Sequence, residues 1–117
     1  MVRKMKKNKP TRYFSNLQEK RVAKTVSGKQ VANSGATKFS KGDVKTEKFL
    51  IECKTCTKEQ KSFTMQKEWF DKNDEEAFAM GYSYSALVFD FGDGVDRYVI
   101  DSALFKRLME VIENEEE

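Results

Sequence analysis

The sequence predicts an α/β fold in which a central mixed β-sheet is flanked by helices. Two observations indicate it: stretches with helical periodicity alternate with short runs rich in β-favouring residues, and glycine or polar clusters separate them. The 117 residues are enough for one domain with one core, but only 38% are hydrophobic and 35% are charged. A small monomer of this composition would be only marginally stable, so we expect a homodimer.

The first regular element is expected after a basic N-terminal arm over residues 1–12. Residues 15–27 predict a helix, because Ser15 and Gln18 have the spacing of a capping box and Gly28 is a natural stop. The segments expected next are a short strand over residues 29–32 and a flexible loop over residues 33–42.

Two strands of a hairpin are expected over residues 43–47 and 48–55. Successive side chains of a strand point to opposite faces, so the second strand divides into two sets. Phe49, Ile51 and Cys53 are expected on one face, and Leu50, Glu52 and Lys54 on the other.

The second half predicts a helix over residues 65–80, strands over 82–91 and 97–100, and a last helix over 103–113. Thr64 and either Asp101 or Ser102 are the expected N-caps of the two helices. The residues expected in the core are Trp69, Phe70, Phe89 and Phe91, with Leu104, Leu108, Val111 and Ile112 on the buried side of the last helix. A dimer interface is the alternative for some of the aromatic residues. One domain is therefore expected over residues 13–114, followed by a frayed acidic tail over 115–117.

The charge distribution is strongly asymmetric although the net charge is only +3. Residues 1–61 hold 17 lysines and arginines against 5 acidic residues, whereas residues 62–117 hold 5 against 14. A basic half of this kind is typical of proteins that bind a polyanion, and the basic arm, which is part of it, could contact phosphates or equally be a solubilising leader. An ordinary solvated surface with an acidic tail is the alternative.

Composition excludes several classes of protein and site. No apolar run approaches the roughly 20 residues that span a bilayer, and no apolar stretch follows the basic N-terminus, so we expect a cytoplasmic protein without a membrane partner. The chain has no histidine, which excludes a histidine-based zinc site and a Ser-His triad. Cys53 and Cys56 lack the second pair of ligands that zinc normally requires, so Cys53 is expected in the core.

Asp43, Glu52 and Lys54 form the most informative group. Glu52 and Lys54 share a strand face, and the hairpin can bring Asp43 against them. Two neighbouring carboxylates repel unless a cation lies between them, and Mg²⁺ is commonly held by one or two carboxylates with phosphate and water. Metal-assisted phosphodiester hydrolysis is therefore the natural chemistry, with Lys54 orienting the water or stabilising transition-state charge. An exposed Glu52–Lys54 ion pair is the alternative.

The segment Gly42-Asp43 followed by Glu52-Cys53-Lys54 resembles the PD-(D/E)xK nuclease superfamily, with Gly42 in the place of proline. The wider stretch is similar to archaeal-type Holliday-junction resolvases and their viral relatives over roughly residues 15–90. The matching segments are Ser34-Gly35-Ala36, Lys41-Gly42-Asp43-Val44, Leu50-Ile51-Glu52-Cys53-Lys54-Thr55, Ser62-Phe63-Thr64 and Lys67-Glu68-Trp69. This resemblance implies a restriction-endonuclease-like three-layer fold, a homodimer that cuts branched DNA to leave 5′-phosphates, and Mg²⁺ as cofactor with Mn²⁺ as a substitute. For a virus-encoded protein, the location implied is the host cell cytoplasm.

The resemblance also implies roles for individual residues. Asp43 and Glu52 correspond to metal ligands, Lys54 to the catalytic lysine, Glu19 to a further acidic ligand and Ser34 to a catalytic loop hydroxyl. A solvated helix charge is the alternative for Glu19, and Ser34 could equally be a plain turn residue. The lysines expected to contact DNA phosphates are Lys38, Lys41, Lys58, Lys61 and Lys67.

Two other functions stay open on the sequence. A nicking, repair or restriction-like nuclease of the same fold would cut linear DNA as readily as branched DNA. A non-catalytic DNA-binding protein of the same fold would bind DNA without metal and without cleavage.

Overall fold

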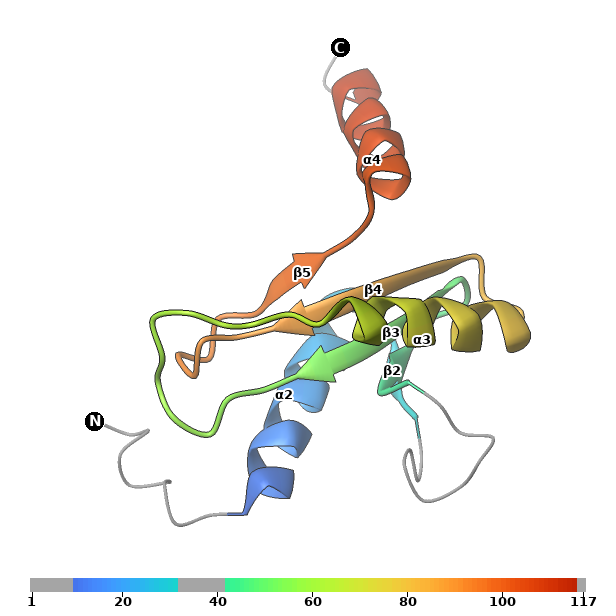
Figure 1. Ribbon diagram of the computed structural model, residues 1–117. Helices are drawn as coiled ribbons and strands as arrows, with labels where there is room; N and C mark the ends of the chain where they lie inside the picture. Colours follow the sequence, from blue (N-terminus) through green and yellow to red (C-terminus); the bar gives the residue numbers. More distant parts are fainter. Residues whose placement is uncertain (1–9, 32–41, 116–117) are drawn as a thin grey trace.

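The protein is built around one five-stranded mixed sheet, which a computed structural model describes over residues 10–31 and 42–115 (Figure 1). The strands lie in the order in which they occur in the chain; β3 and β4 are parallel and all other neighbours are antiparallel. The elements are α2 (Thr11–Val26), β1 (Lys29–Gln30), β2 (Val44–Lys45), β3 (Phe49–Lys54), α3 (Lys67–Ala79), β4 (Tyr84–Phe89), β5 (Arg97–Val99) and α4 (Ser102–Glu115). The expected α/β architecture with a mixed sheet is confirmed.

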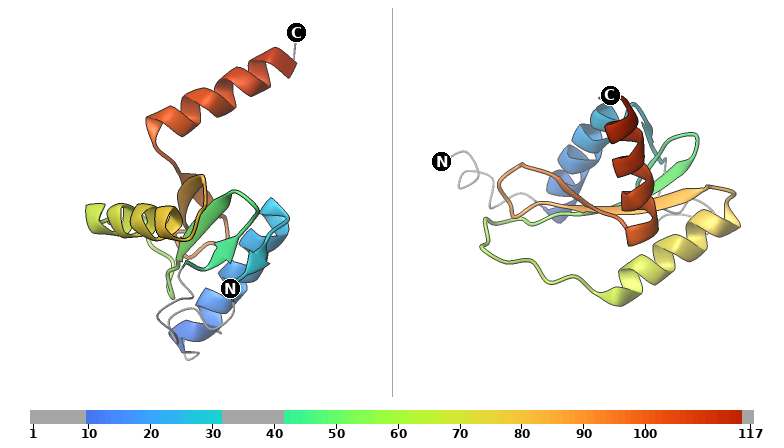
Figure 2. Two further views of the ribbon diagram at one scale, coloured as in Figure 1. Left: turned by 90° about the vertical axis from the view of Figure 1, so that its right-hand side faces the viewer. Right: turned by 90° about the horizontal axis from the view of Figure 1, so that it is seen from above.

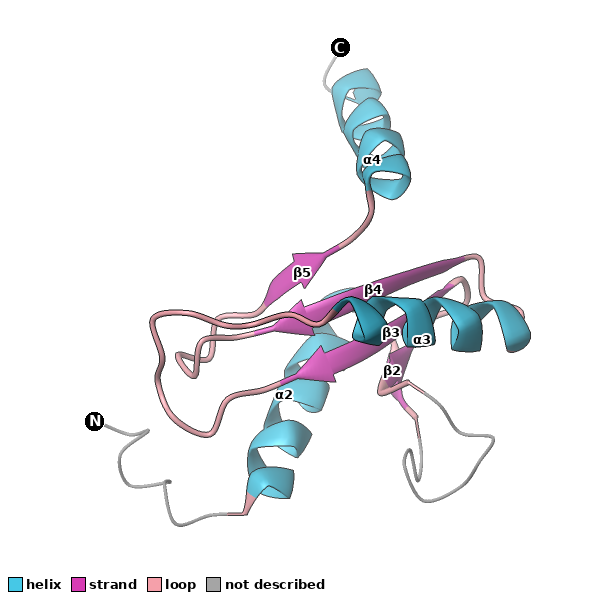
Figure 3. Cartoon of the chain, viewed as in Figure 1, coloured by secondary structure: helices cyan, strands magenta, loops and turns pink. Residues whose placement is uncertain are grey.

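The connections determine which strand ends meet. The short turn between β2 and β3 gives an antiparallel hairpin in which Val44 pairs with Ile51. The parallel pair β3–β4 needs a crossover, and α3 supplies it (Figure 3). Lys54 is the register partner of Phe89, so β3 and β4 end side by side, next to the residues that lead into β2.

Helix α2 covers one face of the sheet and α3 the other (Figure 2). Phe14, Gln18 and Val22 are buried along one side of α2, since residues four apart fall on the same side of a helix. The core beneath α2 consists of Val22, Val44, Ile51, Ala86 and Val88, with Phe49, Cys53 and Ile100 packed against it. The expected division of β3 into two faces is therefore confirmed for Phe49, Ile51 and Cys53.

Asn73 attaches α3 to the opposite face. Its side chain is buried, and its amide donates hydrogen bonds to the carbonyl oxygens of Leu50 (3.3 Å) and Ala86 (3.1 Å). One side chain thus connects the helix to both parallel strands. A buried amide is costly unless it is hydrogen-bonded, so these two bonds also offset the cost of burying Asn73.

The predicted start of the first helix is wrong by one turn. The helix begins at Thr11 after Pro10, whose φ of −68° suits this position, and the N–H of Tyr13 donates to the carbonyl of Pro10 (2.9 Å). Ser15 lies inside the helix, where its hydroxyl donates to the carbonyl of Thr11. Ser15 therefore does not cap the helix, and a proline just before the first turn was the better signal.

The second helix starts later than predicted. Gln66 is its N-cap, and the chain from residue 62 to 66 is not helical, so Thr64 does not cap it. Its end is as expected: Gly81 has a φ of +86°, and the N–H of Tyr82 donates to the carbonyl of Ala77 (2.8 Å).

Helix α4 begins as predicted but is not buried as predicted. The carboxylate of Asp101 accepts a hydrogen bond from the N–H of Leu104 (2.9 Å), which is the expected cap. Leu104 is buried, whereas Leu108, Val111 and Ile112 are 42%, 49% and 52% exposed. The expected burial of these three residues is wrong because α4 projects away from the sheet (Figure 1). A periodic apolar stripe predicts that a helix has a partner surface, but not that the same chain provides it.

Among the described residues, no helix combines the length and the apolar character that a membrane span requires.

Candidate active site

Asp43 and Glu52 meet where the β2–β3 hairpin ends. Asp43 comes directly before β2, and continuing the register of Val44 with Ile51 places it opposite Glu52. The backbone N–H of Asp43 donates to the carbonyl of Ile51 (3.0 Å), and its carboxylate accepts a hydrogen bond from the N–H of Cys53 (2.8 Å). These two bonds hold the Asp43 side chain against β3, beside Glu52.

Gly42 makes this approach possible. Its φ is +77°, a conformation that glycine adopts without strain, and a Cβ at this position would lie 2.6 Å from a methyl carbon of Leu50. A side chain at position 42 would therefore push Asp43 away from the sheet. Position 42 therefore accommodates glycine and no other residue without strain.

Glu52 is a partly buried carboxyl in an acidic neighbourhood. Burial, and then the charge of Asp43, raise the pKa of Glu52 to about 7, although the Lys54 ammonium acts in the opposite direction. The Lys54 Nζ lies 3.5 Å from the Glu52 Oε2, and both side chains are about three-quarters buried. The Glu52–Lys54 ion pair that the sequence analysis considered as the alternative therefore does form, but it is partly buried and not exposed.

Glu19 extends the acidic neighbourhood from the helix side. Its carboxylate accepts a hydrogen bond from the Gln30 side chain (3.2 Å). Burial, and then the charge of Asp43, raise the pKa of Glu19. Asp43 therefore acts on the pKa of both other carboxyls, and we call Glu19, Asp43 and Glu52 the carboxylate set.

The carboxylate set has the chemistry, but not the closed geometry, of a Mg²⁺ site. No group of three or more His, Cys, Asp or Glu side chains in residues 10–31 and 42–115 is arranged to hold a metal ion. The donors are nevertheless all oxygen atoms, which Mg²⁺ prefers, and the pKa values of Glu19 and Glu52 are raised first by burial and then by the charge of Asp43, which a cation would neutralise. As they stand, Glu19 contacts Gln30 and Glu52 contacts Lys54, so the three carboxyls share the donor chemistry of a Mg²⁺ site without converging on one point.

Cys53 does not belong to a metal site. Its side chain packs against the core, as expected, and burial followed by the charge of Asp43 raises the pKa of its thiol far above the usual range. A thiol must lose its proton to bind a metal, so this environment disfavours a cysteine ligand.

Three of the five predicted DNA-binding lysines can be located. Lys58, Lys61 and Lys67 are exposed on the segment that leads from Lys54 into α3. The ammonium of Lys67 contacts the carboxylate of Asp71 at 2.8 Å. The other predicted site residues, Ser34, Lys38 and Lys41, lie outside the described residues, as does most of the basic arm.

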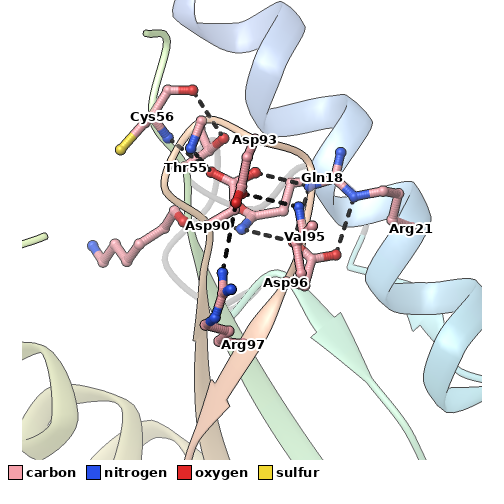
Figure 4. Close-up of polar contacts among 11 residues, drawn as sticks. Gln18, Arg21, Thr55, Cys56, Asp90, Asp93, Val95, Asp96 and Arg97 are labelled. Carbon is pink, nitrogen blue, oxygen red and sulfur yellow. Dashed lines mark hydrogen bonds and ion pairs between the residues drawn. The ribbon is translucent and has the colours of Figure 1, made fainter. Parts of the chain in front are cut away.

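A second group of charged residues, which the sequence analysis missed, supports the same strand end (Figure 4). Arg21 contacts Asp90 and Asp96, each at 2.9 Å, and Asp90 is only 1% exposed. The amide of Gln18, which is fully buried, donates to the carbonyl of Lys54 (2.9 Å) and to Asp96 (3.4 Å). We call Gln18, Arg21, Asp90 and Asp96 the arginine cluster.

Asp90 also holds the two loops that meet at this end. Its carboxylate accepts hydrogen bonds from the N–H groups of Gly92 (3.1 Å) and Cys56 (3.4 Å). A Cβ at position 92 would lie 2.3 Å from the carbonyl oxygen of Lys58, so only glycine lets these loops approach so closely. The sequence did contain a signal for this role, namely an acidic residue at the end of the apolar run 86–89 and two residues before a glycine.

Comparison with models of protein families, with curated proteins and with solved structures finds no match for this chain.

Proposed function

We propose that this protein is a Mg²⁺-dependent, structure-selective DNA endonuclease with a restriction-endonuclease-like fold, and that its substrate is a four-way DNA junction. The observation that carries the proposal is the meeting of Asp43, Glu52 and Lys54 at the end of one hairpin. This pattern supports nuclease chemistry because a carboxylate pair and an ammonium are the groups that phosphodiester hydrolysis with a divalent cation needs.

Each residue has a distinct role in this proposal. Asp43 and Glu52, with Glu19 as a third ligand, hold the cation, which when bound supplies polarisation of a phosphoryl oxygen and a lower pKa for water. Lys54 donates hydrogen bonds either to the attacking water or to the phosphoryl oxygens that gain charge in the transition state. Ser34 adds a hydroxyl near the same phosphate, and Mn²⁺ can replace Mg²⁺.

The lysines supply affinity without reading base sequence. Lys58, Lys61 and Lys67 lie between the end of β3 and the start of α3 and are exposed, so they can contact phosphates beside the scissile bond. Lys38, Lys41 and the basic arm would add further phosphate contacts. Selectivity then depends on the shape and deformability of the junction, as it does for other proteins that contact mainly the backbone.

A second copy of the chain is the occupant we propose for the exposed face of α4. The apolar residues of this face are Phe105, Leu108, Met109, Val111 and Ile112, which are 41% to 59% exposed. Lys106 and Arg107 stand near the start of the helix, and Glu110, Glu113 and Glu115 follow toward its end. Two antiparallel α4 helices related by a twofold axis would therefore match apolar faces and opposite charges at once. Such a dimer would carry two active sites, one for each strand to be cut.

The dimer is tested by sedimentation equilibrium of the wild type and of Leu108→Glu. We expect the wild type to be dimeric and the variant to be monomeric, with Lys72→Gln, an exposed residue of α3, as a control that leaves α4 unchanged. A monomeric wild type, or a dimeric Leu108→Glu variant, would show that α4 is not the interface.

The function is tested by incubating a synthetic four-way junction and a linear duplex of the same sequence with Mg²⁺ or with EDTA. We expect Mg²⁺-dependent cutting of the junction, which Lys54→Ala abolishes while junction binding is retained. Lys72→Ala, an exposed lysine on α3, is the matched control and should cut normally. Equal cutting of both DNAs would favour a nicking, repair or restriction-like nuclease, and metal-independent binding without cleavage would favour a non-catalytic DNA-binding protein.

A further inference from the structure

Lys54 has a second contact, with the face of an aromatic ring. Its Nζ lies 4.3 Å from the centre of the Trp69 ring, while the Glu52 Oε2 lies 3.5 Å from the same nitrogen. The ammonium thus lies between a carboxylate and an indole face. Trp69 is in the first turn of α3, which crosses back over the sheet from the end where β3 stops.

The Trp69 ring is fixed by other aromatic residues. Phe63 packs edge-on against Trp69 at 6.3 Å between ring centres, and its ring is tilted against that of Phe89 at 4.9 Å. Phe89 is the register partner of Lys54 on the neighbouring strand. The ring that contacts the ammonium is therefore connected through Phe63 to the strand beside Lys54. The expectation that Trp69 and Phe89 lie in the core is only half met, since both are partly buried.

The two contacts of Lys54 have different consequences for chemistry. The Glu52 carboxylate accepts hydrogen bonds from the ammonium, and this contact is lost if Glu52 turns to bind a cation. An aromatic face attracts the positive charge through its quadrupole and leaves the N–H groups on the far side available to a phosphate or a water. The ring is thus the contact that can persist while Lys54 works.

We propose that Trp69 is a positioning residue, whose ring face holds the Lys54 ammonium over the reacting phosphate through a cation–π contact. This inference rests on the proposed nuclease function for its consequence, but the contact itself can be tested without DNA. The competing explanation is that Trp69 only fills space between α3 and the sheet. The two explanations differ because a cation–π contact depends on the electron density of the ring, whereas filling space depends on its shape.

The chain contains one tryptophan, so biosynthetic incorporation of fluorinated tryptophans alters position 69 alone. Mono-, di- and tetrafluorotryptophan withdraw electron density stepwise with little change in ring size. We expect the single-turnover cleavage rate to fall with each step, by about three- to tenfold in total, while junction affinity and the urea midpoint stay constant. A cleavage rate that is independent of fluorination would overturn the proposal.

A second measurement does not depend on cleavage. The ring current of Trp69 should shift the Lys54 Hε resonances upfield in the metal-free protein, and Trp69→Leu should abolish that shift. Phe70→Leu, a neighbouring aromatic change on the same helix, is the matched control and should retain it. Unshifted Lys54 resonances in the folded wild type would overturn the contact. Shifted resonances in a protein that does not cut the junction would reject the nuclease function and leave the positioning of Lys54 standing.

Discussion

Lys54 links two acidic regions that differ in how their charge is balanced. Its backbone carbonyl accepts a hydrogen bond from Gln18 in the arginine cluster, and its ammonium contacts Glu52 in the carboxylate set. In the arginine cluster, Asp90 and Asp96 both contact the Arg21 guanidinium, and hydrogen bonding to Asp96, the first cause, raises the pKa of Arg21. In the carboxylate set, burial and mutual repulsion raise the pKa of Glu19 and Glu52.

The difference separates a structural role from a ligand role. Buried carboxylates that a cationic side chain already neutralises stabilise the fold and have little capacity to bind a metal ion. Carboxylates whose negative charge is only partly balanced disfavour the folded state until a cation binds. Carboxylates therefore have a structural role in the arginine cluster and a proposed ligand role in the carboxylate set. The two regions should respond differently to the same kind of substitution.

The largest expected effect is on cleavage. Asp43→Asn keeps an oxygen to accept the Cys53 N–H but removes the charge, so we expect about a 10³-fold slower single-turnover rate, of the size seen when one electrostatic contact to a transition state is lost. Asp96→Asn, the matched change in the arginine cluster, should cut at nearly the wild-type rate and lose stability instead. Cutting by Asp43→Asn at close to the wild-type rate would remove Asp43 from the site.

The next effect is on folding. Arg21→Met leaves Asp90 as a buried charge without its arginine, and breaking a buried pair in this way costs about 3 kcal/mol of unfolding free energy. Urea denaturation followed by circular dichroism measures it. Lys24→Met, an exposed residue on the same helix, is the control and should change the midpoint little. Equal midpoints for the two variants would mean that Arg21 does not stabilise the fold.

A smaller effect of opposite sign is expected for Glu52→Gln without metal. Because the pKa of Glu52 is raised from 4.5 to about 7, its ionisation opposes folding: the penalty is absent below pH 4.5, grows between pH 4.5 and 7, and is complete above pH 7. The variant escapes this penalty and should be more stable than the wild type by about 2 kcal/mol at pH 8, allowing for partial exposure, and not at pH 4. Urea midpoints in EDTA at both pH values measure the difference; a gain at pH 4 equal to that at pH 8 would contradict it.

The smallest effect is expected outside both regions. Lys67 forms an exposed pair with Asp71, so Lys67→Met should leave the urea midpoint unchanged. If Lys67 contacts a phosphate, the slope of log affinity against log salt for junction binding should become shallower by about 0.9. Filter binding across a salt series measures this, and an unchanged slope would remove Lys67 from the DNA surface.

Local patterns were enough to predict most of the fold. Alternation along β3 correctly divided Phe49, Ile51 and Cys53 from Glu52 and Lys54, and Gly81 correctly marked the end of a helix. The strand alternation and the helix-ending glycine can both be recognised from residues that are close together in the sequence. The exposure of Leu108 could not be foreseen, because the stripe on α4 is the same whether its partner is this chain or another.

The candidate site was predictable to a lesser degree. Glu52 and Lys54 lie in β3, and Asp43 directly precedes the adjacent strand β2, so their approach follows from the register of a hairpin with a short turn. The Arg21–Asp90 pair joins residues 69 positions apart, and the Lys54–Trp69 contact depends on how α3 crosses the sheet. Such contacts are set by tertiary packing, which periodicity does not report.

The most direct test of the central claim compares two backbone amides. The N–H of Cys53 donates to Asp43 in the carboxylate set, and the N–H of Cys56 donates to Asp90 in the arginine cluster. Substoichiometric Mn²⁺, a paramagnetic ion that broadens nearby NMR signals steeply with proximity, should broaden the Cys53 amide first in the wild type and not in Asp43→Asn. Broadening that begins at Cys56, or that is the same in both proteins, would contradict a divalent-cation site at Asp43 and Glu52.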